Sequence, residues 1–176
     1  EWERDILLYN EEAGDKEFDI EDEGTEANDL TNHLQSGGNI YLVTDGGAIE
    51  PNRGSFGWVI ASSDKVLWTG GGYTRGYPIE SHRAEGYGRL GGTLFLYHRL
   101  RFLGITTCKN KGMNFCDNTA IVKAVMHEWD PWYKPGATTS PNWDVIAQIH
   151  QIQKKLNETI NITNCQHAKS HQDKDK

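Results

Sequence analysis

Three carboxylates are placed where their chemistry can combine. Asp45 ends an apolar, β-rich run just before two glycines, Asp117 ends another such run, and Glu85 lies near the start of a long helical pattern. If the two runs form parallel neighbouring strands, both aspartates reach the same edge of a sheet, and Glu85 can reach over it. Three acids at one point repel each other unless cations neutralise them, so we expect a magnesium or manganese site.

Each of these carboxylates also has an ordinary structural explanation. Asp45 before Gly-Gly suits a turn, Asp117 could cap a following helix, and Glu85 suits a first helical turn. Their convergence favours the metal site. His171 could shuttle a proton or assist product release, since an unperturbed histidine has a pKa of about 6.5. The alternative for His171 is a solvated histidine in a charged terminal segment.

The elements that would position these residues follow from the hydrophobic pattern. Strand-like runs and helical patterns alternate after an initial group of three strands, with a hairpin turn near residues 62–65. The strands are expected within 39–47, 55–72 (two strands), 113–117 and 160–168, and the helices at 81–104, 118–129 and 142–156. This order predicts an α/β fold in which helices cover a mixed sheet.

The helix expected at 81–104 has Ser81 as a candidate N-cap and ends at Gly104. It contains four internal glycines, each of which costs about 1 kcal/mol relative to alanine. We therefore expect them to serve close packing of the helix against the sheet. These glycines are Gly86, Gly88, Gly91 and Gly92.

The length of 176 residues corresponds to one domain. We expect a soluble, intracellular protein, in cytoplasm or nucleus, because neither a membrane span nor a signal peptide is evident. Three cysteines, Cys108, Cys116 and Cys165, have spacings that fit neither a zinc site nor a disulfide framework. Buried free thiols in a reducing compartment are the favoured interpretation.

Charge divides the chain into two parts. Residues 1–36 contain 13 acidic and two basic residues, a net charge of −11, whereas residues 37–176 carry a net charge of +4. The first part is interpreted as an acidic leader, disordered or loosely docked. The second part is the expected folded domain, and its mildly basic character fits a nucleic-acid partner.

An ordered set of short motifs carries a family resemblance. "TDGG" with Asn52 and "FGWVI", then "HRAE", "CDNTAIVKAV" and "HAKSH", resembles the type 1 ribonuclease H family, which includes ribonuclease H domains of retroelement reverse transcriptases. The resemblance covers residues 39–173. It implies a five-stranded mixed sheet of order 3-2-1-4-5 flanked by helices. It also implies cleavage of the RNA strand of an RNA/DNA hybrid by a two-metal mechanism with Mg²⁺ or Mn²⁺.

The resemblance assigns the metal-binding carboxylates to Asp45, Glu85 and Asp117, and the mobile histidine to His171. Reading a hybrid requires contacts to 2′-hydroxyl groups in a shallow minor groove, which suits small polar residues and exposed backbone. The candidate substrate-binding residues are Gly47, Asn52, Ser81, Asn118 and Thr119.

The family pattern also has a fourth carboxylate at the start of a further helix, whereas this chain stops five residues after His171. Asp173 and Asp175 lie too near the histidine loop to match it. The chain is therefore expected to be part of a longer polyprotein with other domains, or to have a modified site, or to use one of these two aspartates. Two functions stay open: a nuclease for RNA/DNA hybrids, and a non-catalytic ribonuclease H-like module that binds nucleic acid or protein. Neither involves a membrane.

Overall fold

The computed structural model describes residues 23–49, 52–116, 121–122 and 142–167. No helix among these residues has the length and apolar character needed to cross a membrane. The elements are, in chain order, α2 (Glu23–Ser36), β1 (Ile40–Ile49), β2 (Arg53–Ala61), β3 (Val66–Tyr73), α3 (Ser81–Phe102), β4 (Cys108–Cys116), α5 (Trp143–Asn157) and β5 (Ile160–His167).

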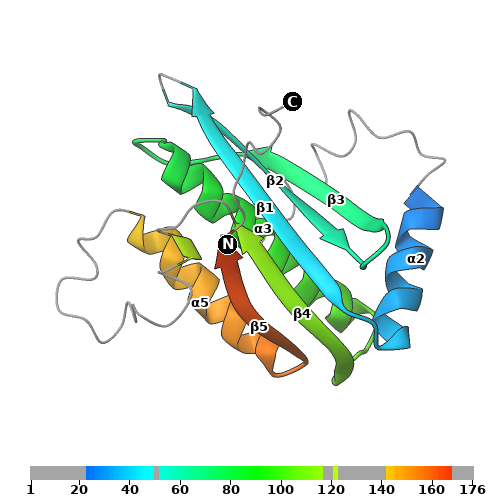
Figure 1. Cartoon of the computed structure of the whole chain (residues 1–176). Helices are drawn as coiled ribbons and strands as arrows, with labels where there is room; N and C mark the ends of the chain where they lie inside the picture. Colours follow the sequence, from blue (N-terminus) through cyan, green and yellow to red (C-terminus); the bar gives the residue numbers. More distant parts are fainter. Residues whose placement is uncertain (1–22, 50–51, 117–120, 123–141, 168–176) are drawn as a thin grey trace.

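The five strands form one mixed sheet of order β3-β2-β1-β4-β5, the order that the family resemblance implies. β1 pairs antiparallel with β2, and β2 pairs antiparallel with β3. β4 lies on the other side of β1, parallel to it, and β5 is parallel to β4. α3 packs on β1 and β2 and lies beside α5, which contacts β5 (Figure 1).

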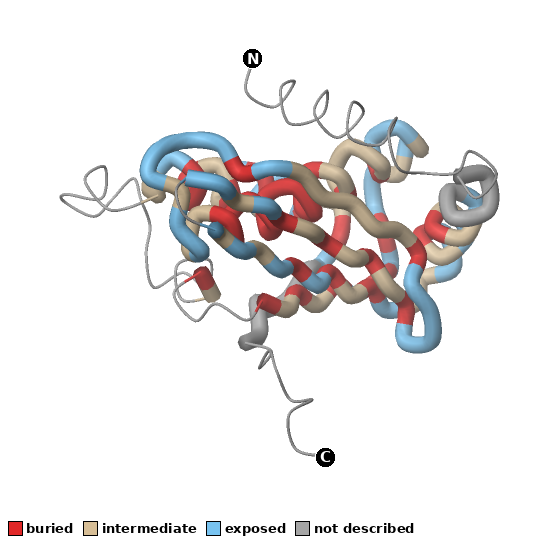
Figure 2. The backbone as a smooth tube through the Cα atoms, turned by 90° about the horizontal axis from the view of Figure 1, so that it is seen from above, coloured by how far each residue is buried: buried red, intermediate tan, exposed pale blue. Residues whose placement is uncertain are grey.

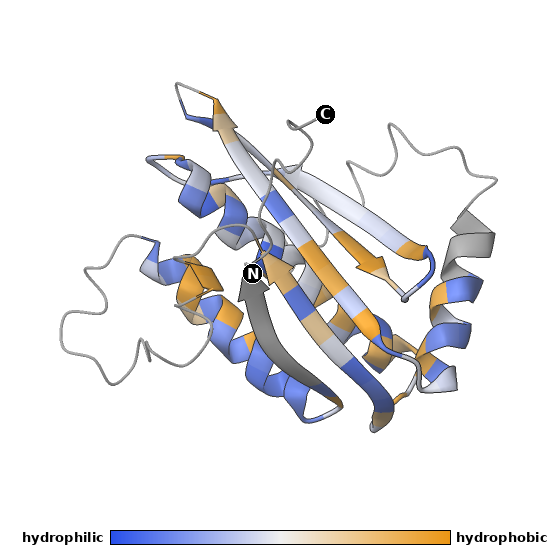
Figure 3. Ribbon diagram, in the orientation of Figure 1, coloured by the Kyte–Doolittle hydropathy of each residue, from blue (hydrophilic) through white to orange (hydrophobic). Residues whose placement is uncertain are grey.

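The core lies between the sheet and these two helices. Along β1 the side chains alternate, so that Ile40 and Leu42 are buried and Val43 is exposed. The hydrophobic residues of β1 lie in its first half and at its tip (Figure 3), and the buried positions run through the middle of the molecule (Figure 2). On β2, Trp58 and Ile60 continue the same buried face.

Three of the four glycines of α3 lie against the sheet, as predicted, whereas Gly86 lies against α5. A Cβ atom added at Gly88 would lie 2.9 Å from the backbone oxygen of Asp45, and one at Gly92 would lie 2.6 Å from Leu42 Cδ1. At Gly86 the added atom would lie 2.9 Å from Val145 of α5. Side chains at these positions would push the helix away from its neighbours.

The two ends of α3 differ from each other in how well the sequence predicts them. Gly104 has φ +69° and ends the helix as expected, since Gly104 N–H donates to Arg101 O. Ser81 is not the N-cap. That position is Glu80, whose extended backbone (φ −119°) precedes the helix, and Ser81 is the first helical residue. The side chain of Glu80 makes no capping hydrogen bond.

Helix α2 lies within the segment expected to be an acidic leader and differs from that expectation. Leu30 and Leu34 are buried in the core, and the helix packs against β3 and β4. The buried Asn110 of β4 donates to His33 O at 3.0 Å and also to Gly38 O, which ties the end of α2 to the sheet. Residues 1–22 lie outside the described residues.

Two of the cysteines agree with the prediction of buried free thiols. Cys108 and Cys116 are both free and buried. Burial raises the pKa of the Cys108 thiol, which donates to Asn110 Oδ1 at 2.6 Å. Cys165 belongs to β5, where only the backbone is described.

Candidate active site

The parallel pairing of β1 and β4 defines the edge at which the site lies. The last paired residues are Thr44 and Cys116, which are followed in the sequence by Asp45 and Asp117. Asp45 is not at the end of its strand, because β1 stays paired with β2 as far as Ile49. Asp117 lies outside the described residues. The predicted parallel arrangement of the two strands is thus confirmed.

Glu85 reaches this edge from the first turns of α3. A Cβ atom added at Gly46 would lie 2.3 Å from Ala84 C and 2.5 Å from Glu85 N, so the helix rests directly on the backbone of β1. The side chain of Glu85 is buried, with 5% exposure. The Cys116 thiol donates to its Oε2 atom across 3.8 Å. Glu85 is therefore next to both β1 and β4.

Asp45 and Glu85 differ in their surroundings. Asp45 is exposed, and its Oδ1 accepts a hydrogen bond of 2.9 Å from Gly46 N–H. Both side chains offer hard oxygen donors, which suit Mg²⁺ or Mn²⁺. The described part of the chain contains no cluster of three or more His, Cys, Asp or Glu residues able to hold a metal ion. Of the three carboxylates predicted to bind the ions, the structure thus describes two, Asp45 and Glu85.

The other predicted residues fall into two groups. Gly47 is exposed and follows Gly46 on β1, and the exposed Ser81 lies one helical turn before Glu85, so both lie beside the carboxylates. Asn52 is exposed just before β2 and has φ +59°. Outside the described residues are His171, Asn118, Thr119, Asp173 and Asp175.

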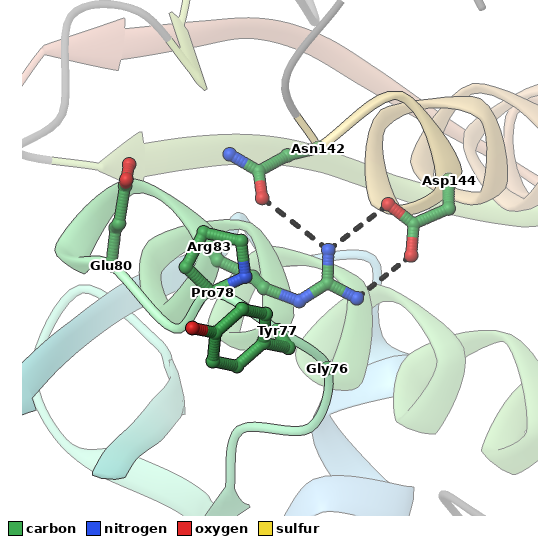
Figure 4. A pocket seen from close by; sticks show the side chains of 7 residues that line it. All are labelled: Gly76, Tyr77, Pro78, Glu80, Arg83, Asn142 and Asp144. Atoms are coloured by element: carbon green, nitrogen blue, oxygen red, sulfur yellow. Dashed lines mark hydrogen bonds and ion pairs between the residues drawn. The ribbon is translucent and has the colours of Figure 1, made fainter. Parts of the chain in front are cut away.

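The sequence analysis did not select two residues near the site: Cys116, whose thiol contacts Glu85, and Arg83, which precedes Glu85 by two residues on α3. The guanidinium of Arg83 forms a bidentate ion pair with Asp144 of α5, at 3.0 Å and 2.7 Å (Figure 4). The motifs "CDNTAIVKAV" and "HRAE" contain Cys116 and Arg83, but the partner of Arg83 is 61 positions away. The pair borders a surface cavity of about 470 Å³, lined by Gly76, Tyr77, Pro78, Glu80, Arg83, Asn142 and Asp144.

This ion pair shifts the ionisation of both partners. The hydrogen bond from Arg83 lowers the pKa of Asp144, and the same bond raises the pKa of Arg83 further above its ordinary value. Tyr87, whose ring lies 5.4 Å from the Arg83 guanidinium carbon, has a raised pKa because it is buried. Arg83 and Asp144 are therefore both charged at neutral pH.

A five-stranded mixed sheet of this order with flanking helices defines the ribonuclease H fold, and the chain has this fold. Ribonuclease H1 from the halophilic archaeon Halobacterium salinarum is similar with a TM-score of 0.51 and 15% identity, over 76% of this chain and 87% of that one. An N-terminal ribonuclease H domain from Mycobacterium tuberculosis is similar with a TM-score of 0.53 and 17% identity, over 76% of this chain and 84% of that one.

A third structure, LC11-RNase H1 in complex with an RNA/DNA hybrid, gives a TM-score of 0.55 and 18% identity over 75% of this chain and 86% of that one. The enzyme was isolated from compost by a metagenomic approach. Comparison of the sequence with models of protein families gives no match, and comparison with curated proteins gives none either. The likeness is thus one of fold.

Proposed function

We propose that this chain is a metal-dependent endonuclease that hydrolyses the RNA strand of RNA/DNA hybrids by a two-metal mechanism. The observation that carries the proposal is the placement of Glu85, a buried carboxylate held against Asp45–Gly46 where β1 and β4 end their parallel pairing. The shared fold supports it, since one of the similar structures is a ribonuclease H1 bound to an RNA/DNA hybrid.

Asp45, Glu85 and Asp117 are the proposed ligands of the ions. When bound, two divalent ions would activate a water molecule and neutralise charge on the attacked phosphate and its leaving oxygen. Gly46 N–H orients the Asp45 carboxylate, and the Cys116 thiol restrains Glu85. His171 is proposed to carry a proton to or from the reacting groups.

Recognition of the hybrid is assigned to small polar groups and exposed backbone around the carboxylates. They would contact the sugar hydroxyls of the RNA strand in the minor groove, where size decides which side chains fit. The proposed residues are Gly47, Asn52, Ser81, Asn118 and Thr119.

The site has three proposed carboxylate ligands, and the fourth of the family pattern has no clear counterpart. We therefore expect one ion to bind more tightly than the second. Manganese should support more activity than magnesium, because it binds carboxylate sites more tightly and is less strict about geometry. If Asp173 or Asp175 supplies the fourth ligand, changing that residue to Asn should abolish magnesium-dependent turnover.

The test is a cleavage assay on a hybrid with a labelled RNA strand, with Mg²⁺ or Mn²⁺. Asp45→Asn, Glu85→Gln and Asp117→Asn should each lose most of the activity while staying folded. Asp64→Asn is the matched control, since this exposed aspartate lies in the turn between β2 and β3 and should cleave like the parent. Parental activity in all three variants would overturn the proposal. Hybrid binding without cleavage in either metal would favour the non-catalytic module.

A further inference from the structure

Arg83 joins three segments of the chain at the start of α3. Besides the two bonds to Asp144, its Nε donates to Arg75 O at 2.6 Å, and its Nη1 donates to Asn142 Oδ1 at 3.3 Å. The side chain is only 11% exposed. A guanidinium whose donors are directed to protein acceptors in this way serves to hold structure rather than to bind a phosphate. The Arg83–Asp144 pair is called the clamp below.

The first turn of α3 has few other restraints of the usual kinds. Its N-cap residue, Glu80, makes no side-chain capping bond, and no acidic residue in the first turn offsets the helix dipole. The backbone bond from Ala84 N–H to Glu80 O, at 3.1 Å, begins the helical ladder. The clamp is therefore a bidentate side-chain restraint at a helix end that lacks a side-chain cap and a first-turn acid.

Arg83 and Glu85 lie on opposite sides of the helix. Two residues span about 200° of rotation, so that Arg83 points to α5 while Glu85 points to the edge of β1 and β4. A rotation of the first turn that moved one side chain would move the other by a similar angle. On the sheet side the helix rests on Gly46, and on the α5 side it is held by the clamp.

We infer that Arg83 and Asp144 are positioning residues of the candidate site: the clamp sets the rotation of the first turn of α3 and thereby the affinity of Glu85 for a divalent ion. The inference rests on the proposed function, which makes Glu85 a metal ligand. In this inference the clamp residues are not ligands of the ion, and both act through the helix that carries Glu85.

The experiment is a calorimetric titration of the metal-free protein with Mn²⁺. Arg83→Gln and Asp144→Asn should bind manganese about 10- to 100-fold more weakly, as expected when a residue that orients a ligand is lost. The manganese affinity of Arg83→Lys should lie between those of the parent and Arg83→Gln, because an ammonium group keeps the charge but cannot form the bidentate pair. The exchanged pair, Arg83→Asp with Asp144→Arg, should recover part of the affinity.

Lys65→Gln is the matched control, since it removes an ion pair of 3.0 Å to Asp29, between the β2–β3 turn and α2. It should leave manganese affinity unchanged. Amide hydrogen exchange should become faster at residues 80–88 in the clamp variants and not in the control. Both measurements are made at a temperature well below the thermal unfolding midpoint of each variant, so that a general loss of stability does not change the result.

Suppose that Glu85→Gln binds manganese weakly while Asp144→Asn or Arg83→Gln binds it as tightly as the parent. This result would overturn the inference and leave the proposed function standing. Parental affinity in Glu85→Gln would instead overturn the proposed role of Glu85. An equal loss in Lys65→Gln would also refute the clamp, because it would show a nonspecific effect. If Arg83→Gln does not fold, Asp144→Asn and Arg83→Lys decide the question.

Discussion

Gly46 has no room for a side chain, because the backbone of α3 occupies that space. A Cβ atom there would lie 2.3–2.5 Å from backbone atoms of Ala84 and Glu85, which cannot move without moving the helix. Gly46→Ala should therefore destabilise the protein by about 1–3 kcal/mol, as overpacking of a rigid contact usually does. Urea denaturation measures the change in the free energy of unfolding.

The neighbouring glycine provides the control for this prediction. Apart from its two chain neighbours, no residue has an atom within 4 Å of a Cβ atom added at Gly47, although both glycines belong to β1. Gly47→Ala should change the free energy of unfolding by less than about 0.5 kcal/mol. Equal effects of the two substitutions would contradict the contact between β1 and α3 described here.

At the residue scale, the sequence predicted the meeting of α3 with the Asp45 region of β1, although Asp45 does not end its strand. Asp45 and Glu85 were expected at one edge, and the structure places α3 against Asp45–Gly46 there. The clamp could not be foreseen, because Asp144 is 61 residues from Arg83 and only the packing of two helices brings them together. Asp117 and His171 remain predictions.

At the scale of elements, the ion pair between α3 and α5 makes stability depend on pH. The bond from Arg83 lowers the pKa of Asp144 in the folded state below its ordinary value of 3.8. The pair therefore stabilises the fold above that value, and this stabilisation is lost as the pH falls through the lowered pKa. Because the Asp144 side chain is 55% exposed, solvent screening keeps the effect small.

Asp144→Asn should accordingly be less stable than the parent at about pH 7, and the difference should shrink towards about pH 3. Urea denaturation of both proteins across this range measures it. Arg83→Gln should show the same dependence, since it removes the other half of the pair. A difference between parent and Asp144→Asn that is the same at both ends of the range would show that Asp144 acts through packing instead.

The helices α3 and α5 were predictable because their apolar residues recur at helical spacing, whereas the strand order came from the family resemblance. Two features were not predictable. Helix α2 is rich in acidic residues, and its described core contacts are made by two leucines, Leu30 and Leu34. Two apolar residues four positions apart are too few to show a helical period. β1 continues beyond Gly46 and Gly47 because pairing with β2 outweighs the tendency of glycines to end a strand.

At the scale of the whole molecule, charge is divided along the sequence. Residues 1–22 contain ten acidic and two basic residues, whereas residues 37–176 carry a net charge of +4. A segment of this charge repels the phosphates of a nucleic acid or competes with them for basic groups. Deleting residues 1–22 should therefore tighten hybrid binding, and should leave in place helix α2, which contributes Leu30 and Leu34 to the core.

Salt provides the discriminating condition for this deletion. The gain in affinity should be larger at about 50 mM than at about 200 mM salt, because salt screens the repulsion. Fluorescence anisotropy with a labelled hybrid measures both affinities. If the deletion leaves the affinity for the hybrid unchanged at both salt concentrations, the acidic segment has no electrostatic influence on binding.

The glycines of α3 also bear on the order in which the molecule folds. With four internal glycines, each costing about 1 kcal/mol of helix propensity, residues 81–102 have little tendency to be helical in isolation. The helix should thus gain its stability from docking on β1 and β2, so we expect it to form no earlier than the pairing of these strands. Glu85 would then reach its place late in folding, and an intermediate with a formed sheet would still have no site for a cation.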